Sequence, residues 1–303
     1  MSFLKRLSWL MERRKKFPPD DIHRAGDLAE MRLAKLSRAA GRDNGWKIYE
    51  SVRIPDPDGG RREIDMVIIG GNSILVVEQK HWAGSFRINK DHHFIQKRKN
   101  GDEHSHDGVA DRIARKARLL AELHQKRLGL ASGDLPDVRV IVAMTHQRLD
   151  WPRIPEGLAA EMVNEKGFLD IIKAVNPGKP TLELVETLEG FNTWDEVHLH
   201  GGLMNKGDVF ELGLGTDIDS LFAKRECEVI GSTQHKRGLF AVFDKQPSKA
   251  SIKIGKKNAD VTLAHGACIN MHVVGEAKPR QIPWACIDKI VLSKPPAEWN
   301  KNG

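Results

Sequence analysis

The chain has 303 residues, with 48 lysine and arginine side chains against 41 aspartate and glutamate side chains, and a formal net charge of +7. An apolar fraction of 40% with 29% charged residues is ordinary for a globular protein and argues against intrinsic disorder. At roughly 100–200 residues per domain, the length predicts two domains or one large one. No apolar run approaches the ~18–20 residues that a membrane-spanning helix needs. The basic excess lies within residues 1–180, so a polyanion is expected to bind there.

The three cysteines, Cys227, Cys268 and Cys286, lie far apart in the sequence. Their odd number and spacing exclude a disulfide framework and a zinc ribbon, and they favour a reducing compartment. The N-terminal residues lack the apolar core and cleavage site of a secretory signal, so a cytoplasmic location is expected. Residues 1–20 are predicted to form a basic arm in which apolar residues recur at helical spacing. Two interpretations stay open for this arm: a weak contact with a membrane surface or a nucleic acid, or a solvated tail.

Residues 21–180 are predicted to form the first domain. Two β-rich runs, EIDMVII at 63–69 and SILVVEQK at 73–80, are joined by Gly-Gly-Asn and read as a hairpin. Both carry apolar residues on both faces, which is typical of central strands covered by helices. The predicted order of helix, three strands, helix, strand and helix indicates a mixed α/β sheet with helices on its faces. Besides the hairpin, the predicted elements are a helix at 21–40, strands at 46–54 and 138–145, and helices at 108–129 and 156–174.

Residues 190–303 are predicted to form a second, β-rich accessory domain. The prolines and glycine at 177–180 mark the boundary. Beyond it, short apolar runs alternate with Gly, Asp, Asn and Pro, which favours a small all-β sandwich or barrel. Recruitment of a protein partner, presentation of substrate and self-association all remain open for it. The expected strands are 196–200, 209–213, 227–231, 238–243, 251–255, 260–264, 269–274 and 287–292.

Three ionisable residues, Asp65, Glu78 and Lys80, occupy the hairpin where a central strand should be apolar. Side chains alternate along a strand, so Glu78 and Lys80 share one face and Gln79 lies on the other. Counting outward from the Gly-Gly-Asn turn places Asp65 almost opposite Glu78. We therefore expect their carboxylates to converge.

Two neighbouring carboxylates repel each other when buried, and a divalent cation removes that cost. Mg²⁺ (or Mn²⁺) commonly takes one or two carboxylates plus water and substrate phosphate, and the backbone carbonyl of Gln79 is a further candidate ligand. Lys80 is suited to position the attacking water and to offset charge on the phosphate. The grouping predicts metal-dependent phosphodiester hydrolysis. The competing interpretation is a solvated ion cluster at the strand ends.

The first domain resembles the nuclease-related domain (NERD) branch of the PD-(D/E)XK nuclease superfamily. The resemblance covers roughly residues 22–175 and rests on these segments: GDLAE at 26–30, EIDMVIIGGNSILVVEQKHWAG at 63–84, the helix near 107–128, and VRVIVAM at 138–144. It implies a restriction-endonuclease-like core, Mg²⁺ dependence, and a site made of Asp65, Glu78, Lys80 and a helix glutamate, Glu30. Glu30 is expected to act on the metal through a water molecule. Gly84 matches the glycine that usually follows the lysine strand.

One position departs from the family pattern. The later helix usually opens with Asn-Pro-x-x-Gln, and the matching stretch here is Asp-Gly-Val-Ala-Asp, so Asp111 stands where the family has glutamine. With the four core positions intact, we predict an active nuclease acting on DNA in preference to RNA. The alternative is a catalytically silent nucleic-acid-binding module with a nuclease-like fold.

Basic side chains outnumber acidic ones between residues 80 and 130, directly after the predicted active strand. Lysine and arginine beside a phosphodiester site neutralise backbone phosphates without reading sequence. A solvated helix face is the competing interpretation, and the histidines at 104 and 106 are expected to be surface residues rather than zinc ligands. The predicted nucleic-acid-binding residues are Arg61, Arg62, Arg87, Lys97, Arg98, Lys99, Arg112, Arg115 and Lys116.

Overall fold

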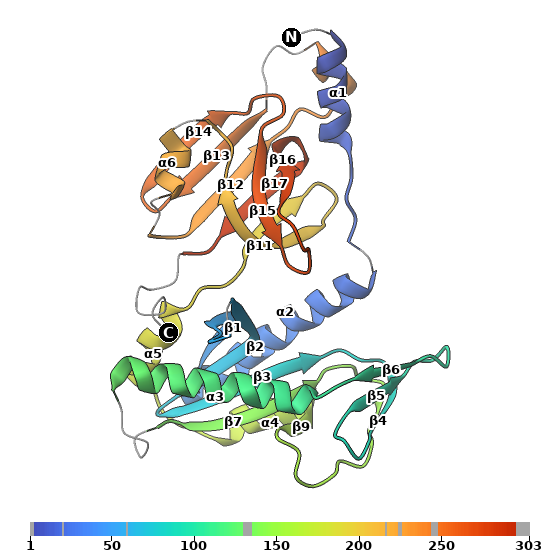
Figure 1. The fold of residues 1–303 in the computed structure, drawn as a ribbon, viewed down its shortest axis with the longest axis vertical. Helices are drawn as coiled ribbons and strands as arrows, with labels where there is room; N and C mark the ends of the chain where they lie inside the picture. The colour runs from blue at the N-terminus through green and yellow to red at the C-terminus, as the bar shows by residue number, and fades with distance from the viewer. Residues whose placement is uncertain are drawn as a thin grey trace. The chain divides into compact units, whose positions relative to one another are not determined.

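The computed structural model describes residues 3–19, 21–58, 60–129, 135–215, 217–223, 226–243 and 248–294. The chain divides into two compact units, drawn in Figure 1. One comprises residues 21–193. The other joins residues 194–294 with residues 3–19, the segment predicted as a separate arm. Within the described residues, no helix is both long enough and apolar enough to cross a membrane.

The unit of residues 21–193 is built on a five-stranded mixed sheet with strand order β1-β2-β3-β7-β9. The first three strands pair antiparallel, and β3, β7 and β9 run parallel. This arrangement confirms the expected nuclease-like α/β core. The strands are β1 (Lys47–Pro55), β2 (Arg61–Gly70), β3 (Ser73–Lys80), β7 (Asp137–Met144) and β9 (Glu161–Asn164).

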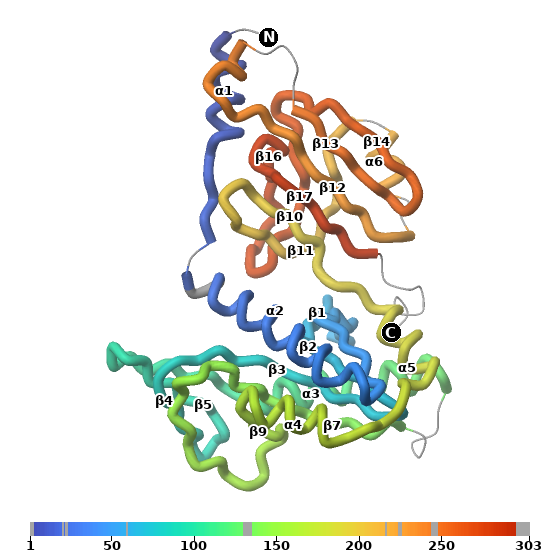
Figure 2. The backbone as a smooth tube through the Cα atoms, turned by 180° about the vertical axis from the view of Figure 1, so that it is seen from behind, coloured from blue at the N-terminus to red at the C-terminus, as the bar shows by residue number. Residues whose placement is uncertain are grey.

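Helices cover both faces of this sheet, as Figures 1 and 2 show from opposite sides. Alternate residues of β3 explain why: Ile74 and Val76 are buried in a core shared with one pair of helices, and Leu75 and Val77 in a core shared with the other. Helices α3 (Val109–Leu128) and α5 (Leu182–Gly190) form the first pair. Helices α2 (Asp21–Gly41) and α4 (Glu165–Ala174) form the second, and the short η1 (Arg42–Asn44) follows α2.

A small four-stranded sheet, order β6-β5-β4-β8, follows the hairpin and was not predicted. Its strands are short and largely polar, so they lack the periodic apolar pattern that identifies a strand. Gly84 begins this sheet with φ +91°, and a Cβ atom there would lie 2.2 Å from the Lys97 carbonyl oxygen. Glycine is therefore required. The strands are β4 (Gly84–Ile88), β5 (Phe94–Lys97), β6 (Glu103–His106) and β8 (Leu149–Asp150).

The helix predicted over 156–174 is shorter in the structure, where α4 begins at Glu165. Asn164 stops it from extending backwards, because its side chain accepts a hydrogen bond of 2.8 Å from the Gly167 amide as an N-cap. The residues before the cap form β9 instead, the last strand of the parallel part of the sheet.

The second unit contains one eight-stranded antiparallel sheet, order β14-β13-β12-β17-β10-β11-β15-β16. It accounts for the expected β-rich region, but the strand predicted at 238–243 is a 3₁₀ helix, η3 (Leu239–Val242). The prediction failed because the run is apolar without being buried: Leu239 and Phe240 are exposed. The strands are β10 (Asp195–Leu199), β11 (Met204–Glu211), β12 (Val229–Gln234), β13 (Lys249–Ile254), β14 (Lys257–Thr262), β15 (Cys268–Val273), β16 (Arg280–Pro283) and β17 (Ile287–Leu292).

Three helical elements complete this unit: α1 (Phe3–Arg14), α6 (Asp217–Ala223) and η4 (Trp284–Cys286). Helix α1 packs on η3 and η4 through a buried face that includes Trp9 and Leu10. After α1, the Phe17 amide donates to the His200 carbonyl, and the Phe17 carbonyl accepts from the Leu203 amide. The N-terminal segment is thus part of the folded unit, not a solvated tail.

Candidate active site

Asp65, Glu78 and Lys80 come together at one edge of the five-stranded sheet, where the central strand β3 ends. The β2–β3 register pairs Met66 with Val77, so the next position brings Asp65 to Glu78, as the turn predicted. Alternation also places all three side chains on the α3 face of the sheet, because Val67 and Val76 point into the core shared with α3.

A backbone hydrogen bond fixes the Asp65 carboxylate. The Gln79 amide donates to its Oδ2 atom over 2.8 Å. In an extended strand the amide and the carbonyl of one residue face the same neighbouring strand, so the Gln79 carbonyl also faces β2. The predicted ligand oxygen of Gln79 therefore points toward the Asp65 side of the strand.

Two ammonium groups bracket Glu78. Lys80 Nζ lies 2.6 Å from its Oε1 atom, and Lys116 Nζ from α3 lies 3.0 Å from its Oε2 atom. All three side chains are largely shielded from solvent. Lys116 was predicted to contact nucleic acid. The structure instead makes it the second basic partner of the Glu78 carboxylate, a contact between residues 38 positions apart.

The two carboxylates differ in their acidity. Burial, and secondarily the charge of Glu78, raises the pKa of Asp65 from 3.8 to about 6. Burial would also raise the pKa of Glu78, but the ammonium groups of Lys80 and Lys116 outweigh it and hold that pKa below its usual value. The edge thus combines a carboxyl group of raised pKa, Asp65, with a carboxylate whose charge is compensated by two lysines, Glu78. Such perturbed pairs are typical of functional sites.

The donor set fits a hard divalent cation. It contains two converging carboxylates and a carbonyl oxygen, and oxygen ligands are what Mg²⁺ prefers. Across the described ranges, no group of three or more His, Cys, Asp or Glu side chains is placed to hold a metal ion. A site with two carboxylates is therefore suited to an ion that keeps several water molecules and binds substrate phosphate, rather than to a fully protein-ligated ion.

Glu30 and Asp111 lie on different helices around this edge. Glu30 is half-buried on α2, which covers the face opposite α3, so its action on a metal through water stays a prediction. Asp111 is exposed in the first turn of α3, on the same helix as Lys116. Nothing in the structure explains why it replaces glutamine.

The predicted nucleic-acid-binding residues fall into two groups. The members of one group have partners in the protein: Arg61 donates to Asn192, Arg62 pairs with Asp56, Arg87 with Glu103, Arg115 with Asp58 and Lys116 with Glu78. The other group is exposed, and for it no ion pair occurs with any residue that the structure describes: Lys97, Arg98, Lys99 and Arg112.

His106, which the sequence predicted to be a surface residue, is a half-buried neighbour of the site. It ends β6, and its ring stacks on Trp82, with centroids 4.1 Å apart and planes 21° apart. Burial lowers its pKa, and the nearby charges of Lys80, His104 and the arginines 112 and 98 lower it further. A neutral imidazole beside Lys80 can accept or donate a proton. His106 reaches this position only because β6 pairs with β5 in the small sheet, which the sequence did not predict.

A basic hollow of about 420 Å³ opens beyond the carboxyl ends of β3 and β7. Its polar floor is ordered: Thr145 Oγ1 lies 3.3 Å from Gln79 Nε2 and 3.0 Å from His81 Nδ1. Of these residues the sequence predicted only Lys99 as a binding residue, because the others come from α2, from the segment after β3 and from the loop after β7. The hollow is lined by Arg32, His81, Ala83, Lys99, Thr145, His146, Gln147 and Arg148.

Comparison with known proteins supports this picture. A family model described as nuclease-related domain (NERD) matches residues 25–145. The match confirms the resemblance inferred from the sequence, and it includes Glu30, Asp65, Glu78, Lys80 and Lys116. No curated protein matches the chain.

Proposed function

Because a family model of the nuclease-related domain matches residues 25–145, we propose that this protein is a divalent-metal-dependent nuclease that hydrolyses phosphodiester bonds. The observation that carries the proposal is the largely buried pair of Asp65 and Glu78, set beside Lys80 and Lys116 at one sheet edge. Buried like charges are costly for folding, so a pair of this kind indicates a role that needs both carboxylates. We propose DNA as the substrate, with RNA as the alternative that the assay below distinguishes.

Each residue of the edge has a role in this proposal. Asp65, Glu78 and the Gln79 carbonyl would hold Mg²⁺ or Mn²⁺, which when bound lowers the pKa of a coordinated water and offsets phosphate charge. The Gln79 amide orients Asp65 for this task. Lys80 can donate hydrogen bonds to the attacking water or to a phosphate oxygen, and so stabilise negative charge that develops in the transition state.

The surrounding cations suit a nucleic-acid backbone. We propose that the basic hollow binds a phosphate next to the one being cleaved, because Lys99 and Arg148 line it at the same sheet edge, together with Arg32, which also pairs with Glu165. Contacts of this kind position a backbone without reading its sequence. The second unit would recruit the substrate or a partner.

A second function is favoured by a specific observation. Both oxygens of Glu78 are bound by ammonium groups, so the two lysines neutralise this carboxylate without a metal ion. Together with Asp111 at the glutamine position, this is what a catalytically silent nucleic-acid-binding module would retain.

One experiment separates the two functions. Purified full-length protein is incubated with circular, linear and single-stranded DNA and with RNA, in Mg²⁺, Mn²⁺ or EDTA. We expect metal-dependent cleavage that falls by about a hundredfold to a thousandfold in Asp65→Asn and Lys80→Ala, the order seen when one transition-state contact is removed. Asp58→Asn, which changes an exposed carboxylate paired with Arg115, is the matched control and should cleave normally. Binding without cleavage in every metal would instead establish the silent module.

A further inference from the structure

Helix α1 has an apolar face that the fold does not use. Its inner face is buried through Trp9, Leu10 and Arg13. Its outer side carries large apolar side chains that remain in solvent, with Leu4 75% exposed. A helix that needed only to pack on its own unit would carry polar residues on that side. The exposed apolar residues of α1 are Phe3, Leu4, Leu7 and Met11.

The 3₁₀ helix η3 extends this surface with residues from the other end of the chain. Leu239, Phe240 and Phe243 are exposed, Phe240 at 86%. The rings of Phe243 and Phe3 lie 6.4 Å apart, and Figures 1 and 2 show the orange η3 segment beside α1 in both views. We call these seven side chains, four on α1 and three at η3, the α1–η3 surface. Scattered exposed apolar residues are common, but a contiguous group of this kind marks an interaction site.

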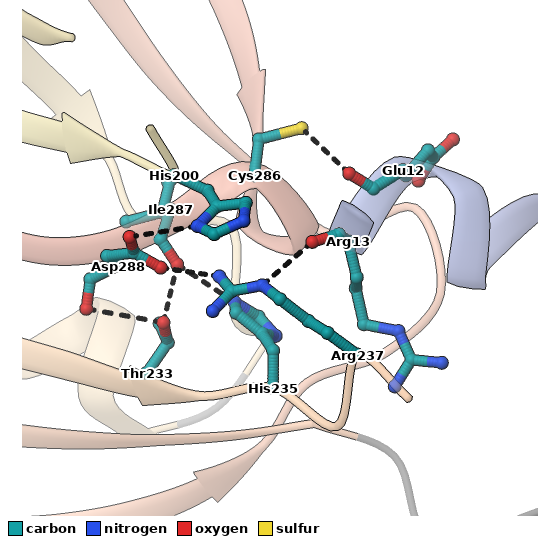
Figure 3. Close-up of polar contacts among 9 residues, drawn as sticks. All are labelled: Glu12, Arg13, His200, Thr233, His235, Arg237, Cys286, Ile287 and Asp288. Carbon is teal, nitrogen blue, oxygen red and sulfur yellow. Dashed lines mark hydrogen bonds and ion pairs between the residues drawn. The ribbon is translucent and has the colours of Figure 1, made fainter. Parts of the chain in front are cut away.

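A polar network holds the two parts of this surface in place (Figure 3). Arg237, just before η3, donates through Nε to the Arg13 carbonyl over 2.8 Å and pairs with Asp288 of β17. The Cys286 thiol of η4 contacts the Glu12 carbonyl at 3.8 Å, so the end of α1 is held at a second point. The α1–η3 surface is thus preformed, which lowers the entropic cost of binding.

The charge around the surface selects its partner. Basic residues dominate α1 and the segment after it, with Glu12 as the one acidic side chain among residues 3–19, and Lys236 precedes η3. A second copy of the chain would bring two basic rims together, and a nucleic acid would leave Leu4 and Leu7 in water. An anionic bilayer offers an apolar interior beneath a negative surface. Arg13 is buried, so the basic residues of α1 and its extension that are accessible to a partner are Lys5, Arg6, Arg14, Lys15 and Lys16.

We propose that the α1–η3 surface binds the anionic face of a phospholipid membrane. The apolar side chains enter the boundary between headgroups and acyl chains, and the basic residues contact the acidic headgroups. The contact is peripheral, since α1 has only 12 residues. A single short amphipathic element gives reversible binding, so the second unit attaches the nuclease-related domain to a membrane transiently.

Vesicle sedimentation of the full-length protein tests this proposal independently of nuclease activity. We expect binding to phosphatidylcholine vesicles that contain phosphatidylserine, weak binding to phosphatidylcholine alone, and loss of binding at high salt. Phe240→Ser and Leu4→Gln should each weaken partitioning about tenfold, the effect of removing one large apolar side chain from the bilayer boundary. The matched control is Phe210→Ser on β11 of the same unit, where Phe210 is 56% exposed outside the α1–η3 surface.

Three results would overturn the proposal. The first is that the wild-type protein does not sediment with phosphatidylserine vesicles. The second is that Phe210→Ser weakens binding as much as Phe240→Ser. The third is a concentration-dependent dimer in analytical ultracentrifugation that Phe240→Ser abolishes, which would assign the surface to a second copy. Because the substituted side chains are exposed, unchanged circular dichroism and melting temperature verify that each variant is folded.

Discussion

Each unit of this protein has an aspartate that is largely shielded from solvent, and the surroundings of the two aspartates are opposite in kind. Asp195 of β10 is 4% exposed, and its two oxygens accept hydrogen bonds of 2.8 Å from the Val209 and Ser293 amides. Asp65 of β2 accepts one such bond, from the Gln79 amide, and it faces a second carboxylate. A buried charge surrounded by hydrogen-bond donors joins strands, whereas one opposed by a like charge costs stability unless a proton or a cation compensates it.

The largest effect is expected at Asp195. Asp195→Ala leaves two buried amides without these acceptors, at a cost of 1–3 kcal/mol each, so the second unit should lose about 4 kcal/mol of unfolding free energy. Urea unfolding followed by circular dichroism measures this loss. If Asp195→Ala unfolds like the wild type, then Asp195 does not join β10 to β11 and the end of β17.

Substitution of Asp65 should change the free energy of unfolding in the opposite direction and stabilise the protein. Asp65→Asn keeps an acceptor for the Gln79 amide and removes a charge that burial and Glu78 disfavour. The rise in its pKa from 3.8 to about 6 corresponds to roughly 3 kcal/mol, so at pH 8 without metal the variant should be more stable by up to that amount. A variant that is less stable than the wild type in EDTA would contradict the interpretation of Asp65 as a destabilising carboxylate.

The gain from Asp65→Asn should depend on pH. The native protein takes up the Asp65 proton at about pH 6 and the unfolded chain takes it up near 3.8, so native stability falls as pH rises between those values. The difference in unfolding free energy between variant and wild type should be largest above pH 6, shrink as pH falls, and vanish below pH 3.8. Urea titrations across this range test the sign, and a difference independent of pH would attribute the gain to packing alone.

Two neighbouring basic residues of α3 sharpen the comparison further. Lys116 binds the largely buried Glu78, so Lys116→Met should cost about 2 kcal/mol, the value of a hydrogen bond between charged groups. Arg115 pairs with Asp58 at the surface, both being more than half exposed, so Arg115→Met should cost at most about 1 kcal/mol. Equal losses in thermal unfolding would mean that the Lys116 contact is no stronger than a surface ion pair.

The smallest effect is expected at the basic hollow. Arg148→Ala should weaken binding of a DNA oligonucleotide about fivefold, the order expected for one backbone phosphate contact. It should also reduce the slope of the logarithm of the binding constant against the logarithm of salt concentration by about one. Lys173→Ala is the matched control, because the Lys173 carbonyl meets Asn44 near the opposite edge of the sheet. Fluorescence anisotropy in EDTA separates binding from cleavage. An equal loss in the two variants would indicate diffuse attraction and no defined phosphate site.

The local sequence pattern was sufficient to predict the hairpin and its register. The strand period of two and the tight turn at Gly71 and Asn72 determine which residues of β2 and β3 meet, so the pairing of Asp65 with Glu78 could be calculated from the sequence. The long amphipathic helices were equally clear, and α3 spans 109–128 where 108–129 was predicted. The short polar strands of the small sheet escaped because they have no periodic apolar pattern.

The sequence by itself determined the fold class, the nuclease-related resemblance and the excess of basic residues beside Asp65, Glu78 and Lys80. Only the tertiary structure decided which of those basic residues face solvent and which, like Lys116, compensate a buried carboxylate. It alone joined Phe3 to Phe243 in the α1–η3 surface. The physical reason is the range of the contacts: periodicity and turns report on neighbours along the chain, whereas these partners are brought together by packing of elements far apart in sequence.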